Sequence, residues 1–126
     1  GEESERHALA FEQERLIGLG LPKLADRIKD CRETPKCGYD FRSFTAPGVP
    51  RYIEVKTFTK DAGGHRFFLS ANQLGVSTSV PCRDEYYFYL VTYKPDGSFD
   101  DVFVKTAQEA HRLGERIPTE FVMRFS

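Results

Sequence analysis

The sequence of 126 residues contains few cysteines, and their number is odd. Cys31, Cys37 and Cys82 therefore cannot form a complete disulfide framework, and we expect reduced thiols. Cys31 and Cys37 are too widely spaced for the usual paired ligands of a metal centre, and no histidine lies at a matching offset. A zinc or iron–sulfur centre is thus the weaker alternative to thiols that lie in loops or in the core.

Histidine is equally scarce. The three histidines, His7, His65 and His111, fall in separate predicted elements, so a histidine-based metal site or catalytic triad has little support. Ser43 and Ser70 have no neighbouring base in the sequence. Nucleophilic catalysis by serine therefore lacks the partners that it needs.

Long apolar runs and a strong net charge are absent as well. No run approaches the roughly 18 to 20 residues that span a bilayer, and no charged-then-apolar signal segment opens the sequence. We therefore expect an intracellular protein, cytoplasmic or nuclear, without membrane contact. The net charge is −1, so any contact with nucleic acid must come from a local basic surface or from the rest of a longer protein.

The length and composition are typical of one globular domain. The chain can bury one core but not two, with 40% hydrophobic and 29% charged residues. The first residue is Gly rather than Met and the next several are polar, which suits a domain excised from a longer polypeptide. We expect a single domain over residues 1–126 that is part of a larger protein.

The residue pattern predicts an α/β order of elements. Helix-forming residues and apolar spacing predict helices over residues 4–17 and 21–29. Aromatic and β-branched residues predict an antiparallel hairpin with strands at 39–44 and 51–58, joined by a turn at 46–50. The pattern also predicts strands at 66–69, 85–93, 99–104 and 121–125 and helices at 71–76, after the N-cap Ser70, and at 107–113.

The segment that carries chemistry is the predicted strand at 51–58. Alternation places Glu54 and Lys56 on one face, while Ile53 and Val55 point to the other face, in the core. Asp40 precedes this strand by one hairpin. A hard cation binds oxygen ligands, so two carboxylates and a main-chain carbonyl supply a partial shell. A nearby lysine can orient the attacking water and stabilise negative charge on a phosphodiester.

Taken alone, Glu-x-Lys on a strand is more often a salt-bridged pair on a solvated face, with Asp40 merely fixing the loop after Gly38. Three further features favour a catalytic site. Glu12 or Glu14 lies on the first predicted helix, an aspartate precedes the Glu-x-Lys strand by one hairpin, and the next helix begins with the sequence Ser-Ala-Asn-Gln at 70–73. The order and the type of these elements both match a known family pattern.

In these segments the sequence resembles the PD-(D/E)XK nuclease superfamily and, within it, the Mrr-like branch. The closest likeness is to the No Vein-type C-terminal domain of uncharacterised function, which occurs in helicase-like and ATPase-like proteins. The likeness rests on residues 11–12, 38–40, 51–56, 67–74 and 86–91. It implies a restriction-endonuclease-like core, with a central mixed β-sheet flanked by helices. It also implies a metal-dependent endonuclease that cuts nucleic acid, with DNA as the expected substrate.

The resemblance implies a Mg²⁺ or Mn²⁺ site. Asp40 and Glu54 would bind the metal, the Val55 carbonyl would be a further ligand, and Glu12 would bind through water. Dimerisation, which many enzymes that cut both strands need, stays open, since the strand at 99–104 or the C-terminal strand could pair with a second copy.

The resemblance also assigns supporting roles. Lys56 would orient the nucleophilic water, and Gln73, early in the next helix, would help to hold the site. Tyr39 stands where the family motif has proline, at a position that varies widely in the superfamily. A free-standing nuclease of this kind is often more basic than this chain, so we expect fused helicase or ATPase domains to contribute to DNA binding.

Two other classes of function stay open. The domain could retain the nuclease fold as a non-catalytic module that binds nucleic acid or regulates a fused helicase or ATPase, or its acidic N-terminus could meet a protein partner. His65, next to Arg66, and Lys60 could contact phosphate, although simple surface roles are the commoner case. The aromatic run at 86–89 could stack bases, although such a run in a strand is more often divided between the core and the sheet surface.

Overall fold

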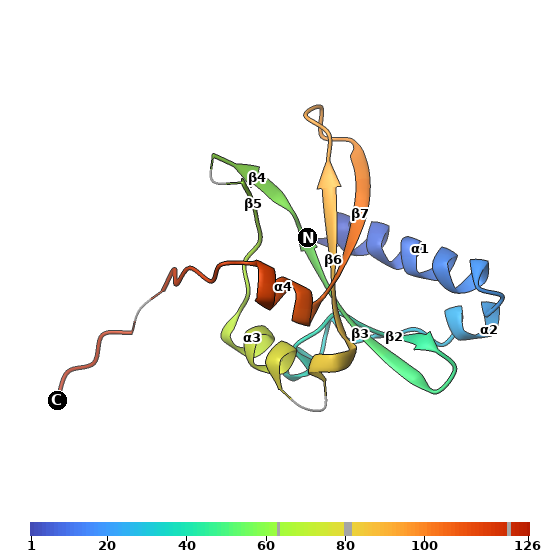
Figure 1. The fold of residues 1–126 in the computed structure, drawn as a ribbon, viewed down its shortest axis with the longest axis horizontal. Coiled ribbons are helices and arrows are strands. Elements are labelled where there is room, and N and C mark those ends of the chain that lie inside the picture. Colours follow the sequence, from blue (N-terminus) through green and yellow to red (C-terminus); the bar gives the residue numbers. More distant parts are fainter. Residues whose placement is uncertain (63, 80–81, 121) are drawn as a thin grey trace.

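The computed structural model describes residues 1–62, 64–79, 82–120 and 122–126 (Figure 1). In these residues, one sheet contains five strands in the spatial order β1-β2-β3-β6-β7, and β4 and β5 form a separate hairpin. The strands are β1 (Lys29–Asp30), β2 (Phe41–Ala46), β3 (Val49–Thr57), β4 (Thr59–Asp61), β5 (Gly64–Arg66), β6 (Tyr86–Tyr93) and β7 (Phe99–Thr106). The helices are α1 (Glu2–Gly18), α2 (Pro22–Ala25), α3 (Ala71–Thr78) and α4 (Ala107–Leu113), with single 3₁₀ turns η1 (Pro35–Cys37) and η2 (Arg83–Glu85).

The sheet is mixed because one of its pairings is parallel. Strands β3 and β6 pair in parallel, from Tyr52↔Tyr86 to Thr57↔Val91, whereas the other neighbours in the sheet are antiparallel. A parallel pair needs a crossover, and the chain makes it through the β4–β5 hairpin and α3. The structure thus confirms the predicted α/β class with a central mixed sheet flanked by helices.

Apolar side chains bury both faces of the sheet. On one face, Ile53 and Val55 of β3 and Tyr89 of β6 pack with Ala8 of α1. On the other face, Phe88 and its neighbours on β6 pack with Ala107 at the start of α4 and with residues of α3. Figure 1 shows α1 on one side of β6 and both α3 and α4 on the other. The central strands therefore lie between two layers of helices.

This double burial decides the role of the aromatic run in β6. Tyr86, Phe88 and Tyr89 are completely buried, and Tyr87 is half-buried, with the Arg51 guanidinium carbon 3.9 Å from its ring centroid. The interpretation that this run stacks the bases of a ligand is therefore wrong, because its rings fill the two cores instead.

Local signals set the start of the helix next to the site. Ser70 caps α3, as predicted, because its hydroxyl accepts a hydrogen bond from the Gln73 backbone N–H at 3.1 Å. The Gln73 side-chain oxygen in turn accepts from the Ser70 N–H at 3.1 Å, which completes a capping box. The cap fixes the position of the Gln73 side chain.

Several element boundaries differ from the predictions. The helix predicted over 21–29 is limited to α2, since Lys29 already pairs with Arg42 in the sheet. Val49 and Pro50, predicted in the turn, belong to β3. Of the strand predicted at 66–69, only Arg66 is in a strand. Of the strand predicted at 121–125, residue 121 lies outside the described residues and 122–125 form no strand, because this segment extends away from the sheet (Figure 1).

The other helices and the two hairpins of the main sheet lie closer to their predicted positions. The first helix, the antiparallel β2–β3 hairpin, α3, the β6–β7 hairpin and α4 all occur where the sequence places them, to within a few residues. No helix in the described part of the chain has both the length and the apolar composition that crossing a bilayer requires.

Candidate functional site

Asp40 lies immediately before β2, where the pairing of β2 with β3 begins. Its backbone N–H donates to the Ile53 carbonyl at 2.8 Å, and its side-chain Oδ2 accepts from the Val55 N–H at 2.8 Å. Gly38, two residues earlier, has a φ of +72° and lies directly against α3, since a Cβ at this position would come within 2.7 Å of Val76 Cγ2. The glycine therefore allows the segment before Asp40 to pack closely against α3.

The Val55 carbonyl lies beside the Asp40 carboxylate. The N–H and C=O of one strand residue point to the same side of the strand, so the Val55 carbonyl is directed to the side where its N–H meets Asp40. The β2–β3 ladder extends only to Phe41↔Ile53, and the Val55 carbonyl lies past this end. A carboxylate and a main-chain carbonyl are thus brought together at the end of the ladder.

Glu54 and Lys56 lie on the face of β3 that α3 covers. The Lys56 ammonium is 3.4 Å from Glu54 Oε2 and donates a hydrogen bond to Gln73 Oε1 at 2.8 Å. The Gln73 amide nitrogen donates to Glu54 Oε2 at 3.0 Å. The salt-bridged pair of the alternative interpretation is present, but the solvated face is not, since the exposure of Glu54 is 3%. Gln73 thus holds the carboxylate and the ammonium of the Glu-x-Lys motif at the same time.

Burial and like charge raise the pKa values of both carboxyl groups. Burial and, to a smaller extent, the negative charge of Asp40 raise the pKa of Glu54 to about 8, although Lys56 acts in the opposite direction. Burial also raises the pKa of Asp40, although the hydrogen bond from Val55 N–H acts in the opposite direction. A divalent cation would relieve the repulsion between two carboxylates, and oxygen ligands suit Mg²⁺ or Mn²⁺. The donor set therefore fits the predicted metal.

These residues line one pocket of about 470 Å³. Its wall includes Asp40, Glu54, Val55, Lys56 and Gln73, so the structure brings together five of the six predicted site residues. The β4–β5 hairpin, the segment after it and the start of α1 supply most of the remaining wall. The pocket is thus a continuous surface from the acidic pair to the hairpin.

Glu12 is the sixth predicted residue, and it lies elsewhere. Its exposure is 1%, and its carboxylate accepts two hydrogen bonds from Arg15, one from Ser43 and one from the Tyr89 hydroxyl, at 2.5–2.7 Å. Tyr89 points to the face of the sheet that α1 covers, opposite to Glu54. The prediction that Glu12 binds the metal through water is therefore wrong, because its oxygens are saturated on the other face. The alternative, Glu14, is exposed on the outer side of α1 and does not line the pocket.

The helix carboxylate at the pocket is Glu5, which the sequence reasoning missed. Glu5 lines the same pocket as Asp40, and its negative charge contributes to the raised pKa of Asp40. Its carboxylate also forms an ion pair with Arg32 at 3.1 Å. Glu5 lies about two helical turns before Glu12 and so projects in nearly the same direction from α1. The sequence contains both candidates, and only the position of the helix along the sheet distinguishes them.

The described residues place no three or more His, Cys, Asp and Glu side chains in a group that could hold a metal ion. A metal at this site would therefore depend on the two carboxylates of Asp40 and Glu54 and on backbone oxygen. The cysteines are not joined by disulfide bonds, and burial raises the pKa of both Cys31 and Cys82, which disfavours the thiolates that bind zinc. The expectation of reduced thiols is met.

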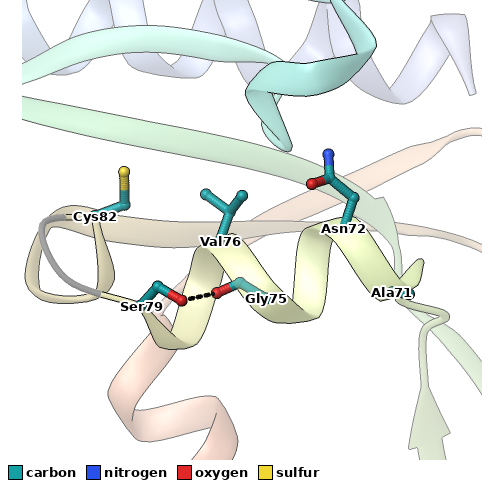
Figure 2. Close-up of a pocket in the computed structure, with 6 residues that line it drawn as sticks. All are labelled: Ala71, Asn72, Gly75, Val76, Ser79 and Cys82. Carbon is teal, nitrogen blue, oxygen red and sulfur yellow. Dashed lines mark hydrogen bonds between the residues drawn. The ribbon is translucent and has the colours of Figure 1, made fainter.

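A second pocket, of about 320 Å³, lies along α3 and has little chemistry. Figure 2 shows its lining residues: Ala71, Asn72, Gly75, Val76, Ser79 and Cys82. None of them is charged, and the Ser79 hydroxyl is engaged with the Gly75 carbonyl at 2.6 Å. The acidic pocket is therefore the candidate functional site.

The fold and this pocket define a class of protein: an α/β domain with a mixed sheet that carries an acidic pair and a lysine at the end of a β-ladder. The chain belongs to the family described as Protein NO VEIN, C-terminal, whose model matches residues 4–104. This match confirms the resemblance to the No Vein-type C-terminal domain and covers all the site residues. No curated protein and no solved structure matches the chain.

Proposed function

We propose that this domain is a metal-dependent nuclease that hydrolyses phosphodiester bonds in nucleic acid, with DNA as its substrate. The observation that carries the proposal is the placement of Lys56 beside Glu54 by Gln73, in the pocket that Asp40 also lines. An aspartate and a Glu-x-Lys strand in this arrangement agree with the PD-(D/E)XK interpretation and its restriction-endonuclease-like core.

Asp40, Glu54 and the Val55 carbonyl would hold Mg²⁺ or Mn²⁺. When bound, such an ion neutralises charge on the phosphodiester and makes a bound water a better nucleophile at neutral pH. The hydrogen bond that Asp40 Oδ2 accepts from the Val55 N–H would orient the carboxylate for this purpose. Glu5 takes the place of Glu12 as the helix carboxylate that faces the pocket.

Lys56 would act on the water and on the phosphate. Its ammonium has three N–H donors, and Gln73 Oε1 accepts one of them. A second can orient the attacking water, and the positive charge stabilises the negative charge that develops on the phosphate oxygens. Gln73 is a positioning residue, because it contacts Lys56 and Glu54 rather than the reacting atoms.

The net charge of −1 offers little overall attraction to nucleic acid, which supports a role within a larger protein whose other domains bind it. The matching family is named for the C-terminal part of a protein, and fused helicase or ATPase domains would deliver the nucleic acid in a DNA-processing or defence protein. A second copy that pairs along β7, the last strand in the order of the described sheet, would bring a second site into the assembly.

One observation favours a second candidate, a non-catalytic module for nucleic-acid binding or for regulation of a fused helicase or ATPase. Gln73 and Lys56 both contact Glu54 Oε2, so this oxygen is already engaged within the protein. In this second reading the polar cluster holds α3 against β3. Cleavage separates the two candidates.

The test is cleavage of labelled duplex and single-stranded DNA and RNA with Mg²⁺ or Mn²⁺. Asp40→Asn keeps an oxygen for the Val55 N–H, and Lys56→Ala removes the ammonium; we expect both to abolish cutting. Glu14→Gln, a carboxylate change outside the pocket, is the matched control and should cut normally. Binding without cutting, in both this chain and a longer protein that contains it, would establish the non-catalytic module.

A further inference from the structure

An exposed aromatic ring lies at the wall of the acidic pocket. Phe67 and Phe68 follow the β4–β5 hairpin and point in different directions. Phe67 packs in the core, with its ring centroid 5.1 Å from that of Phe88. Phe68 lines the pocket and is 60% exposed. The buried ring thus anchors the segment, and the exposed ring lines the same pocket as the acidic pair.

Two cationic side chains line the pocket together with this ring. The Arg66 guanidinium carbon lies 5.0 Å from the Phe68 ring centroid, and Arg66 lines the pocket as well. Lys56, on β3, also lines the pocket. On the other face of the hairpin, exposed Lys60 lies directly opposite exposed His65. The pocket therefore combines an aromatic face with positive charge, which complements a base and its phosphate.

We propose that Phe68, supported by Arg66, is a stacking platform for an unpaired base, and that the substrate of this site is single-stranded nucleic acid. A base within a duplex is stacked on both faces and offers neither to a side chain, whereas every unpaired base has an accessible π-face. Arg66 and Lys56 would contact the adjoining phosphates. The assignment of a substrate rests on the proposed nuclease function, but the binding itself does not depend on cleavage.

The experiment measures binding without cleavage. Fluorescence anisotropy in EDTA compares the affinity of the 126-residue chain for a labelled 12-nucleotide single strand and for the matching duplex. We expect tighter binding of the single strand. Phe68→Ala should weaken it about 5- to 140-fold, since stacking contributes roughly 1–3 kcal/mol per base. Phe68→Trp, which retains an aromatic face, should bind at least as tightly as the wild type.

A matched control separates stacking from the loss of any exposed ring. Phe103 lies on β7, is 48% exposed and does not line the pocket, so Phe103→Ala should leave the affinity unchanged. Both rings are largely exposed, and circular dichroism should show a folded protein for each variant. Equal affinity for single strand and duplex, no binding of either, or an unchanged affinity in Phe68→Ala would overturn the proposal.

Cleavage with Mg²⁺ distinguishes a failure of this proposal from a failure of the nuclease function. A protein that binds single strands through Phe68 but never cuts has the stacking platform and lacks the nuclease activity. A protein that cuts, but whose KM for single strands is the same in Phe68→Ala, has the nuclease activity and lacks the platform.

Discussion

Gln73 accepts a hydrogen bond from Lys56 at 2.8 Å and donates one to Glu54 at 3.0 Å, so one residue of α3 holds both charged residues of the motif on β3. The same Gln73 oxygen accepts from the Ser70 N–H in the cap of α3. The start of this helix and the geometry of the site are therefore one structural feature.

This relationship predicts the effect of Gln73→Ala. We expect cleavage to fall about 10- to 100-fold, because Lys56 loses the acceptor that holds it, as for other residues that orient the groups at a metal site. The loss of the hydrogen bond that the Gln73 side chain accepts from the Ser70 N–H should also lower the free energy of unfolding by about 1 kcal/mol. Single-turnover rates and urea denaturation measure the two effects.

Glu109→Ala is the matched control, because Glu109 plays the same part in the capping box of α4 with Thr106. It should destabilise its helix in the same way and leave the rate of cleavage unchanged. If Gln73→Ala and Glu109→Ala lost activity in the same proportion to their loss of stability, the role of Gln73 in the site would be contradicted.

The assignment of Glu5 to the pocket and of Glu12 to the buried hydrogen-bond network is testable as well. In Glu12→Ala, donors of Arg15, Ser43 and Tyr89 lose the carboxylate that accepts their hydrogen bonds. The substitution should therefore lower the free energy of unfolding by about 3–5 kcal/mol. Glu5→Gln should change the stability little and weaken the binding of Mn²⁺, measured by calorimetric titration. If Glu12→Gln weakened Mn²⁺ binding at unchanged stability, the assignment would have to be reversed.

Binding of a divalent cation should stabilise the fold. At a metal concentration of 100 times the Kd, the expected gain is about 2.7 kcal/mol, seen as a higher Tm in a thermal melt. Asp40→Asn should abolish the gain, because it removes one carboxylate of the pair. Asp100→Asn, on the exposed surface of β7, should retain it. An equal rise in Tm in both variants would mean that the ion binds elsewhere.

His111 predicts a dependence of stability on pH. Burial lowers the pKa of His111, and nearby Arg116 lowers it further, while Ser77 lies 3.0 Å from its Nε2. The folded state thus favours the neutral ring. Its contribution to stability is complete above the unfolded pKa of about 6.5 and is lost as the pH falls through the lower folded value.

The free energy of unfolding of the wild type should therefore fall between pH 7.5 and pH 5, and it should fall less in His111→Gln. Urea denaturation at several pH values measures both. An equal fall in the two proteins would mean that protonation of His111 does not contribute to the pH dependence of the free energy of unfolding.

Much of the fold follows from local patterns. The periodicity of apolar residues placed α1 and the two hairpins, and Ser70 marked the start of α3. The strand predicted at 66–69 failed because β5 pairs only with β4, and propensity does not say which strands pair. The strand predicted at 121–125 failed over residues 122–125, since a strand needs a partner as well as suitable residues.

The sequence by itself determined the element order and the Asp40, Glu54 and Lys56 motif, because alternation on a strand decides which side chains share a face. Tertiary structure decided the rest of the site. Whether Glu5 or Glu12 reaches the pocket depends on how α1 lies along the sheet, and the parallel pairing of β3 with β6 depends on the crossover that brings Gln73 and Phe68 over Glu54. Such contacts join residues far apart in the chain, and local periodicity does not encode them.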